Sequence, residues 1–377
     1  MDDFNSKFSL LASAEPTGAC GYLTVDLSAL RRNYAKMASL VAPGSAAAVV
    51  KADAYGLGAG PVSNAFYDAG CRHFFVAQFQ EAMALRPQLA DDGQIFVLNG
   101  LQPGNEELAA IHHIVPVLNS FDQVRRWSQM AGKLRTRLPA VLQFDSGMSR
   151  LGFPPEDRRE LRSLLQSDQG LDILFMMSHL ASADEPEHAQ NADQLAAVKS
   201  ICQEFPDLRI SFANSAGVFL GDNYHGFLAR PGLALYGGAP VGGAANPMQP
   251  VIRLDISVIQ TRTVNAGARV GYGAAYVASG ERRLATLAAG YADGLLRSLS
   301  DRGAVFYQGV RLPIVGRVSM DSMTVDVTDL PDNTLSLGSL VEMIGPHQTL
   351  EDVAAAAGTI AYELLTSLGQ RYHRRYI

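Results

Sequence analysis

The feature that most constrains the fold is a regular alternation of short apolar runs and amphipathic segments between about residues 45 and 240. Eight apolar runs recur at intervals of roughly 20 to 35 residues, and segments with helical spacing of apolar side chains lie between most of them. The runs cover residues 46–51, 73–78, 95–99, 114–118, 141–145, 173–179, 208–213 and 233–236. Eight strands that alternate with helices predict an α/β fold, namely a (β/α)8 TIM-type barrel.

The pattern changes after the Gly- and Pro-rich stretch 237–250. Strand-like runs then follow one another directly, at residues 251–264, 284–289, 311–318, 323–327 and 340–344, before two helical segments near the C-terminus. We therefore expect a barrel over residues 20–245 and a mainly β domain over residues 246–377. A doubly wound sheet is the alternative for the first domain, but no Gly-x-Gly-x-x-Gly sequence follows a strand-like run.

Composition indicates a globular protein whose partner is a small molecule. The chain is 47% hydrophobic and 18% charged, as is typical of globular proteins. Its net charge of −6 and its lack of any Lys/Arg run argue against nucleic acid or a membrane surface as the main partner. The three cysteines are far apart, which favours a reducing compartment, and the acidic N-terminus lacks the pattern of a signal peptide. We expect a cytoplasmic protein, and the absence of a Cys/His cluster predicts no metal site.

Lys51 closes the first apolar run, and a turn that contains Tyr55, Gly56 and Gly58 follows it. Because the run is apolar on both faces, the amine is poorly solvated, its pKa falls, and the neutral form can act as a nucleophile or proton carrier. The glycines let backbone approach a ligand closely. The alternative is a lysine that extends from a strand end into water.

Other polar residues also follow the predicted strands. Asp145 with Arg150 just beyond it, His179, the Asn214-Ser215 pair and the Arg230-Pro231-Gly232 turn lie at or near strand ends, where barrel enzymes have their active sites. The planar guanidinium of Arg150 is suited to binding a carboxylate, and the backbone N–H groups of the Arg230-Pro231-Gly232 turn could bind an anion. Each also has an ordinary interpretation, as a surface ion pair, a core histidine or a simple turn.

Taken together, in this order and spacing, these segments resemble the alanine racemase family over residues 20–372. Seven motifs agree: the turn after the lysine, Gly-Met-Ser-Arg, Ser-His-Leu-Ala-Ser-Ala-Asp, Ala-Asn-Ser-Ala, Arg-Pro-Gly-Leu-Ala-Leu-Tyr-Gly, Gly-Tyr-Gly-Ala and Gly-Tyr-Ala-Asp-Gly. The resemblance implies a pyridoxal-phosphate enzyme in which an eight-stranded barrel is joined to a C-terminal β domain.

The resemblance also implies the reaction, which interconverts L-alanine and D-alanine for peptidoglycan synthesis or alanine catabolism. Lys51 would hold the cofactor as an aldimine and act as one proton carrier, and Tyr272 from the partner subunit of a head-to-tail homodimer would be the other. Racemisation needs a base on each face of Cα, which a lysine and an opposed tyrosine provide. Arg230 would face the pyridine nitrogen, and His179 would hydrogen-bond both Arg230 and Tyr272.

The remaining contacts are assigned by the same resemblance. The phosphate would be bound by Tyr55, Ser215, Gly232, Leu233 and Tyr362. The substrate carboxylate would be bound by Arg150 and the backbone of Met320. The entrance would be formed by Tyr291, Asp184 and Arg297, with Tyr291 and Tyr362 leaving room for little more than a methyl side chain.

Three positions depart from the family pattern. Gln143 stands where many members have a carbamylated lysine that braces the substrate-binding arginine, and an amide brings no negative charge. Leu57 stands where many have histidine, and Ser319 where cysteine is frequent.

Three other functions compete with alanine racemisation. One is a racemase for a larger amino acid on the same scaffold, and another is a barrel that only binds pyridoxal phosphate. The third is a barrel-type decarboxylase, although those enzymes usually pair the ring nitrogen with an acidic residue, whereas this chain has Arg230.

Overall fold

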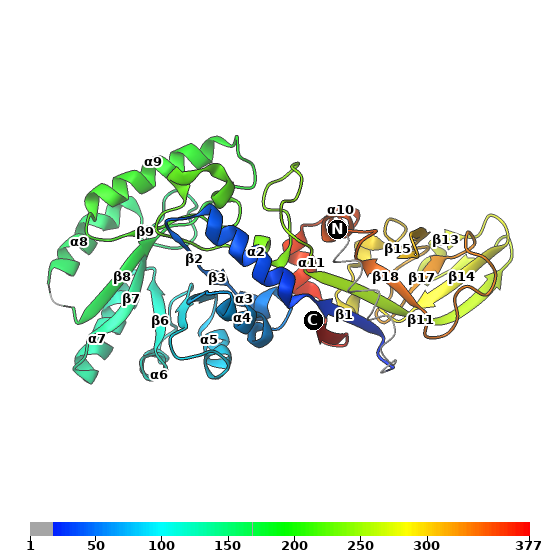
Figure 1. Ribbon diagram of the computed structural model, residues 1–377, viewed down its shortest axis with the longest axis horizontal. Coiled ribbons are helices and arrows are strands. Elements are labelled where there is room, and N and C mark those ends of the chain that lie inside the picture. Colours follow the sequence, from blue (N-terminus) through cyan, green and yellow to red (C-terminus); the bar gives the residue numbers. More distant parts are fainter. Residues whose placement is uncertain (1–17, 168) are drawn as a thin grey trace. The chain divides into compact units, whose positions relative to one another are not determined.

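The computed structural model describes residues 18–167 and 169–377, which form two compact units (Figure 1). Leu27–Gln249 form the first, which we call the barrel unit. Residues 18–26 join Pro250–Ile377 in the second, the β unit. None of the helices in the described ranges is long and apolar enough to cross a membrane.

The barrel unit is built on a sheet of parallel strands that closes on itself. Seven strands pair in chain order: β3 (Ala48–Val49), β4 (His73–Val76), β5 (Gln94–Val97), β6 (Ile114–Leu118), β7 (Leu138–Gln143), β8 (Leu171–Met177) and β9 (Ile210–Ser211). β10 (Leu228–Ala229) is the eighth and pairs in parallel with β2 (Ser45–Ala46), immediately before β3. The Arg230 N–H donates to the Ala213 carbonyl at 2.8 Å, which links β10 to the segment after β9. The predicted barrel is therefore confirmed.

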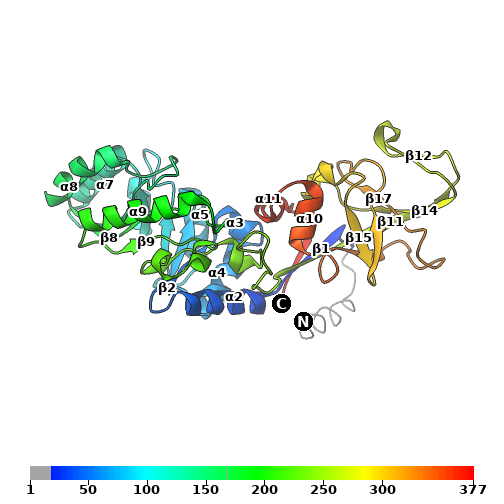
Figure 2. The same ribbon diagram turned by 90° about the horizontal axis from the view of Figure 1, so that it is seen from above.

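Helices connect these strands and cover the outside of the sheet, as α7, α8 and α9 do in Figures 1 and 2. The α-helices are α2 (Leu27–Leu40), α3 (Lys51–Tyr55), α4 (Ala59–Asp68), α5 (Phe79–Leu85), α6 (Glu106–Ile111), α7 (Phe121–Leu134), α8 (Arg158–Gln166) and α9 (Ala189–Glu204). The short 3-10 helices are η1 (Arg86–Gln88), η2 (Pro155–Asp157), η3 (Gly217–Leu220), η4 (Asp222–Tyr224) and η5 (Leu233–Tyr236). α7 shows why such segments fold this way: Ser120 caps its first turn, and Val124, Trp127 and Ala131 are buried at helical spacing.

The prediction of the last barrel strand was wrong. Residues 233–236 form the helix η5, and the strand lies earlier, at Leu228–Ala229. All four residues of η5 are buried, and a short run of buried apolar residues has no periodicity that separates a strand from a helical turn.

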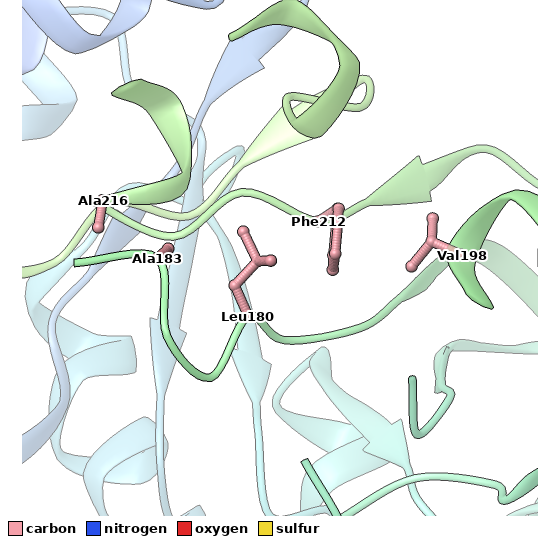
Figure 3. Close-up of a cluster of buried hydrophobic side chains, with 5 residues drawn as sticks. All are labelled: Leu180, Ala183, Val198, Phe212 and Ala216. Carbon is pink, nitrogen blue, oxygen red and sulfur yellow. The ribbon is translucent and has the colours of Figure 1, made fainter. Parts of the chain in front are cut away.

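A hydrophobic cluster in the barrel unit lies at the segments that follow β8 and β9 (Figure 3). Its buried members are Leu180, Ala183, Val198, Phe212 and Ala216, which come from the segments after β8 and β9 and from α9. The cluster therefore fixes two loops at the carboxyl ends of neighbouring strands.

The β unit contains an eight-stranded sheet in which a long strand, β11 (Ile252–Val264), pairs with three others. The remaining strands of this sheet are β1 (Gly21–Val25), β14 (Arg282–Leu287), β15 (Ala304–Tyr307), β16 (Val310–Pro313), β17 (Met323–Asp326), β18 (Leu340–Ile344) and β19 (His373–Tyr376). A separate hairpin of β12 (Arg269–Val270) and β13 (Tyr276–Val277) contains η6 (Tyr272–Ala274). The other elements are η7 (Tyr291–Asp293), η8 (Arg297–Leu299), α10 (Leu350–Ala357) and α11 (Ala361–Ser367). This is the mainly β domain expected from the sequence.

β1 lies outside the barrel unit, whereas the sequence placed residues 20–26 in the barrel. The strand pairs antiparallel with β11, Gly21 opposite Ile256, and parallel with β19, Tyr22 opposite His373. Both partners are more than 200 residues away in the chain, so local pattern alone gives no sign of the pairing.

Replacing Phe212 by alanine tests the hydrophobic cluster. Phe212 is only 1% exposed, so we expect Phe212→Ala to lower the free energy of unfolding by about 3–5 kcal/mol in urea denaturation. Leu108→Ala, at a side chain that is 46% exposed, is the control and should change it by about 0.5 kcal/mol or less. Equal losses for the two variants would contradict this account of the core.

Candidate active site

Lys51 stands at the carboxyl end of the first barrel strand, as the sequence predicts. The Val50 N–H donates to the Phe75 carbonyl at 2.8 Å, which keeps the residue before the lysine aligned with β4. Lys51 then begins α3, a single turn with unusual backbone geometry. Residues 52 to 55 have φ values of 53°, 54°, 53° and 56°, which is the left-handed region, and Gly56 follows with φ 82°.

The environment of Lys51 lowers its pKa. Burial is the largest cause and the nearby positive charge of Arg150 adds to it, whereas Glu81 acts in the opposite direction. A lowered pKa increases the fraction of neutral amine at a given pH, and the neutral amine is the nucleophilic and proton-accepting form.

The loop that contains Arg150 follows β7 and is held at its start by one carboxylate. Asp145 Oδ1 accepts the N–H groups of Gly147, Met148 and Ser149 at 2.8, 3.0 and 3.2 Å. The Arg150 side chain is exposed, and its charge acts on both Lys51 and His179. Arg150, Lys51 and His179 therefore lie in one electrostatic environment.

Gln143 is buried beneath this loop. Its side-chain Nε2 donates to the Leu151 carbonyl at 3.3 Å. Its backbone carbonyl accepts the Phe153 N–H at 2.8 Å. Gly152, with φ 102°, passes so close that a Cβ there would lie 2.8 Å from the Gln143 carbonyl oxygen. Gln143 therefore binds the backbone of the arginine loop.

Arg230 is buried without a carboxylate partner among the described residues. Its guanidinium donates to Ser211 Oγ and to the Ser178 carbonyl, both at 2.5 Å. Burial lowers the pKa of Arg230 to about 9, so the group still has its proton at neutral pH.

His179 is neutral near physiological pH. Burial, followed by the positive charges of Arg230, Arg150 and Lys51, lowers its pKa to about 3. The hydrogen bond that we expected between its ring and Arg230 is not found among the described residues, in which Arg230 instead bonds to Ser211, Ser178 and Phe212. His179 and Arg230 are nevertheless close enough to influence each other electrostatically.

Ser215, Gly232 and Tyr55 meet at one point of the barrel unit. Ser215 Oγ accepts the N–H groups of Gly232 at 2.8 Å and Ala234 at 3.2 Å. A Cβ on Gly232 would lie 2.2 Å from the Tyr55 hydroxyl, so only glycine leaves room for this oxygen. The Tyr55 ring stacks on Tyr236 at 4.5 Å between centroids. The Tyr55 and Ser215 hydroxyls thus lie close to Gly232, next to Leu233, and the N–H groups of Gly232 and Ala234 donate to Ser215 Oγ.

The β unit gathers a second set of predicted residues. Tyr272, on η6, is 72% exposed, and its turn packs beside Arg317, because a Cβ on Gly271 would be 3.4 Å from the Arg317 nitrogen. The Tyr291 N–H donates to the Ser319 carbonyl at 3.0 Å, directly before Met320. Tyr291 and Met320 are exposed, and so both present their side chains at the surface of the unit.

The remaining predicted residues, Tyr362, Arg297 and Asp184, are all exposed. Tyr362 on α11 is 42% exposed, and Arg297 on η8 is exposed. Asp184 is exposed in the loop after β8, where its carbonyl accepts the Gly242 N–H at 3.0 Å. Within the described ranges no cluster of His, Cys, Asp and Glu could hold a metal ion.

Glu81 and Ser211 help to organise the site and were not anticipated from the sequence, and Asp145 was expected at a strand end but not as the residue that holds the arginine loop. Asp145 precedes Ser146-Gly147, which is a signature of a turn held by an aspartate, and Glu81 is three residues after Gln78, as in a capping box. Both signals were present but are common. Ser211, which accepts a bond from Arg230, has no distinguishing local pattern.

Comparison with known proteins gives a consistent result over almost the whole chain. Residues 25–240 match the family profile described as alanine racemase, N-terminal domain, and residues 251–376 match that described as alanine racemase, C-terminal domain. The chain is 65% identical to the catabolic alanine racemase of Rhizobium johnstonii over 359 residues, 95% of each protein. It is 58% identical to the catabolic alanine racemase of Agrobacterium fabrum, over 96% of this chain and 93% of that protein.

Solved structures agree. The alanine racemase of Bartonella henselae with covalently bound pyridoxal phosphate has a TM-score of 0.91 and 43% identity, and the match covers 95% of this chain and 100% of that one. The biosynthetic alanine racemase of Pseudomonas aeruginosa has a TM-score of 0.87 and 36% identity, over 95% and 99%.

The neutral state of His179 has a testable effect on stability. In the unfolded chain a histidine takes up a proton below about pH 6.5, whereas His179 in the folded protein stays neutral down to about pH 3, so stability falls as the pH decreases between these values. Between pH 7 and 5 the wild type should lose about 1–2 kcal/mol more than His179→Gln in urea denaturation. His113→Gln, at an exposed position, is the control and should follow the wild type. If His179→Gln also follows the wild type, the histidine is protonated in the folded state.

Proposed function

Because the chain belongs to the alanine racemase family, we propose that it interconverts L-alanine and D-alanine with pyridoxal phosphate as cofactor. Membership confirms the resemblance found in the sequence and the class of enzyme, a pyridoxal-phosphate-dependent isomerase. The observation that carries the proposal is the half-buried Lys51 with its lowered pKa at the carboxyl end of a barrel strand, in the same electrostatic environment as Arg150 and His179.

The residues of the barrel unit fit the cofactor. The Lys51 amine would hold it covalently, and Tyr55, Ser215, Gly232 and the adjoining Leu233 would bind its phosphate, with Tyr362 as a further contact. Support for this phosphate site comes from the convergence of the Ser215 hydroxyl with two backbone N–H groups and from the space that Gly232 leaves for the Tyr55 oxygen. Pyridoxal phosphate, when bound, withdraws electrons from Cα of an amino acid and so makes its proton acidic.

Two side chains would move that proton. Lys51, neutral in part because burial lowers its pKa, would serve one face of Cα, and Tyr272 would serve the other. Arg230 would lie against the ring nitrogen, where a guanidinium that keeps its proton limits electron withdrawal. An arginine at this position, rather than the acid that a decarboxylase usually has there, supports a racemase.

Arg150 and the backbone of Met320 would bind the substrate carboxylate. The Gly147–Gly152 loop is held by Asp145 and Gln143, so the guanidinium needs no charged brace to be presented. Tyr291 and Tyr362, with Asp184 and Arg297 farther out, would narrow the entrance and favour a methyl side chain.

Tyr272 would complete the active site of a second copy in a head-to-tail homodimer. Its side chain is 72% exposed, which is unusual for a tyrosine and fits a residue whose contacts come from another chain. We propose that the enzyme is cytoplasmic and that the β unit, to which β1 belongs, contributes to the partner's site. The names of the Rhizobium johnstonii and Agrobacterium fabrum relatives support a role in alanine catabolism over peptidoglycan supply.

The two proposed bases can be tested separately and together. Lys51→Ala should abolish both racemisation and covalent attachment of the cofactor, whereas Tyr272→Phe should abolish racemisation and keep the attachment. Chiral analysis of alanine and absorbance of the bound cofactor measure these effects. If the dimer shares its sites, the two variants can be mixed after mild dissociation, and each mixed dimer then has one intact site of two. Because about half of the dimers are mixed, the whole mixture should recover about a quarter of wild-type activity.

Each alternative gives a different outcome. No recovery in mixtures that contain mixed dimers would show that Tyr272 acts within its own chain. Cofactor binding without any racemisation by the wild type would favour a pyridoxal-phosphate carrier, release of carbon dioxide would favour a decarboxylase, and faster turnover of lysine, arginine or serine than of alanine would favour a racemase for another amino acid.

The catabolic role predicts regulation by the substrate. Transcript levels in the source bacterium should rise when alanine replaces another carbon source, and quantitative measurement of the transcript checks this. A level that does not depend on the carbon source would instead fit constant supply of D-alanine to the cell wall.

A further inference from the structure

Glu81 connects the segment after Lys51 to the neighbouring strand and has no part in the reaction described above. Its Oε1 accepts the Ala52 N–H at 2.5 Å, and its Oε2 accepts the N–H groups of Ala77 at 2.7 Å and Gln78 at 2.9 Å. Ala52 follows Lys51 directly, and Ala77 and Gln78 follow β4. One carboxylate thus ties the backbone beside the lysine to the carboxyl end of the next strand, at the start of α5.

The backbone that Glu81 holds is strained. Four consecutive residues without a glycine, 52 to 55, are left-handed, and this conformation costs about 1–2 kcal/mol for each L-residue. Such a turn persists only when surrounding contacts fix it. Asp53 Oδ1, which accepts the Ala59 N–H at 2.7 Å, holds one end of the turn, and Glu81 holds the end that adjoins the lysine.

Comparable bridges elsewhere in the barrel explain why this residue is an acid. Gln123 on α7 accepts the Asn119 N–H at 2.7 Å and donates to the Asn99 carbonyl at 3.0 Å. Gln194 on α9 likewise accepts one N–H and donates to one carbonyl. Glu81 faces N–H donors at both oxygens, so an amide would turn its NH2 group toward another donor. Only a carboxylate satisfies both sides, and it brings a negative charge close to Lys51.

We propose that Glu81 is a positioning residue for Lys51, whose carboxylate fixes the left-handed turn that directs the amine and whose charge faces that amine. The proposal rests on the proposed function in taking Lys51 as the lysine that holds the cofactor. Among the described residues, the charged groups that act on Lys51 are Arg150 and Glu81. Burial and Arg150 lower the pKa of Lys51 and Glu81 opposes them, so Glu81 keeps the amine able to hold a proton as well as release it.

Three variants separate the roles of charge and bridge. Glu81→Gln keeps the length of the side chain but loses the charge and one acceptor. Glu81→Asp keeps the charge but is too short to reach both strands. Gln123→Glu is the matched control, because it exchanges acid and amide in the equivalent bridge between β5 and β6.

Two measurements do not depend on turnover. Protein stripped of pyridoxal phosphate is labelled with a small amine-reactive anhydride at a series of pH values, and mass spectrometry gives the midpoint for Lys51. The rate at which Lys51 binds added pyridoxal phosphate is followed by borohydride reduction and peptide mapping. Thermal unfolding of all variants, together with kcat, KM and the pH profile of the cofactor-loaded enzymes, completes the comparison.

We expect Glu81→Gln to lower the labelling midpoint by about one pH unit, because it removes a negative charge that favours the protonated amine. It should also slow cofactor attachment and kcat at least about tenfold with little change in KM. Glu81→Asp should keep the midpoint and slow attachment, and Gln123→Glu should change stability alone.

The proposal is overturned if Glu81→Gln matches Gln123→Glu in both labelling midpoint and attachment rate at equal thermal stability. If Glu81→Gln does not fold, Glu81→Asp provides the test. Cofactor attachment at the wild-type rate in that variant would show that the hydrogen bonds of Glu81 to the two strands do not position Lys51. A wild type that binds the cofactor but does not racemise alanine would refute the proposed function, whereas the labelling and attachment results would still judge the role of Glu81.

Discussion

The closure of the parallel sheet is the interaction on which the rest of the barrel unit depends. Backbone bonds from Ser45 to Phe227, Ala47 to Ala229 and Val49 to Pro231, at 2.8, 2.8 and 3.0 Å, join the first strand to the last. They bring the strand that precedes Lys51 against the segment that contains Arg230, although about 180 residues separate the two in the chain. Because all strands are parallel, their carboxyl ends meet on one rim, and every loop that presents a polar group to the site begins there.

The chemistry of this rim depends on positive groups that are buried or half-buried. Arg230 is buried among carbonyl and hydroxyl oxygens, and the charge of Arg150, whose own side chain is exposed, acts on Lys51 and His179. Burial lowers the pKa values of Arg230 and Lys51 and keeps His179 neutral, whereas Glu81 acts on Lys51 in the opposite direction. A phosphate and a carboxylate would bring negative charge to these groups, so the electrostatics of the protein match the ligands that we propose for it.

Much of this architecture could be predicted from the sequence, and the failures have physical causes. Apolar runs and helical periodicity predicted the barrel, and the positions after those runs predicted Lys51, Arg150, His179 and Arg230. The helix η5 was taken for a strand because its four residues are all buried. The pairing of β1 and the bond from Ala52 to Glu81 join distant segments, which local side-chain patterns do not reveal. The turn held by Asp145 has a local pattern, but one too common to single it out.

The place of β1 has a consequence for how the chain is synthesised. This strand lies between β11 and β19, and residues 373–376 of β19 are made more than 300 residues after it. The barrel unit can form its parallel sheet once residue 249 is available, whereas β1 must wait, with one edge unpaired, until β19 has been made. Translation therefore imposes a fixed order on the two units, and the exposed edge of β1 is the segment that chaperones have most reason to protect.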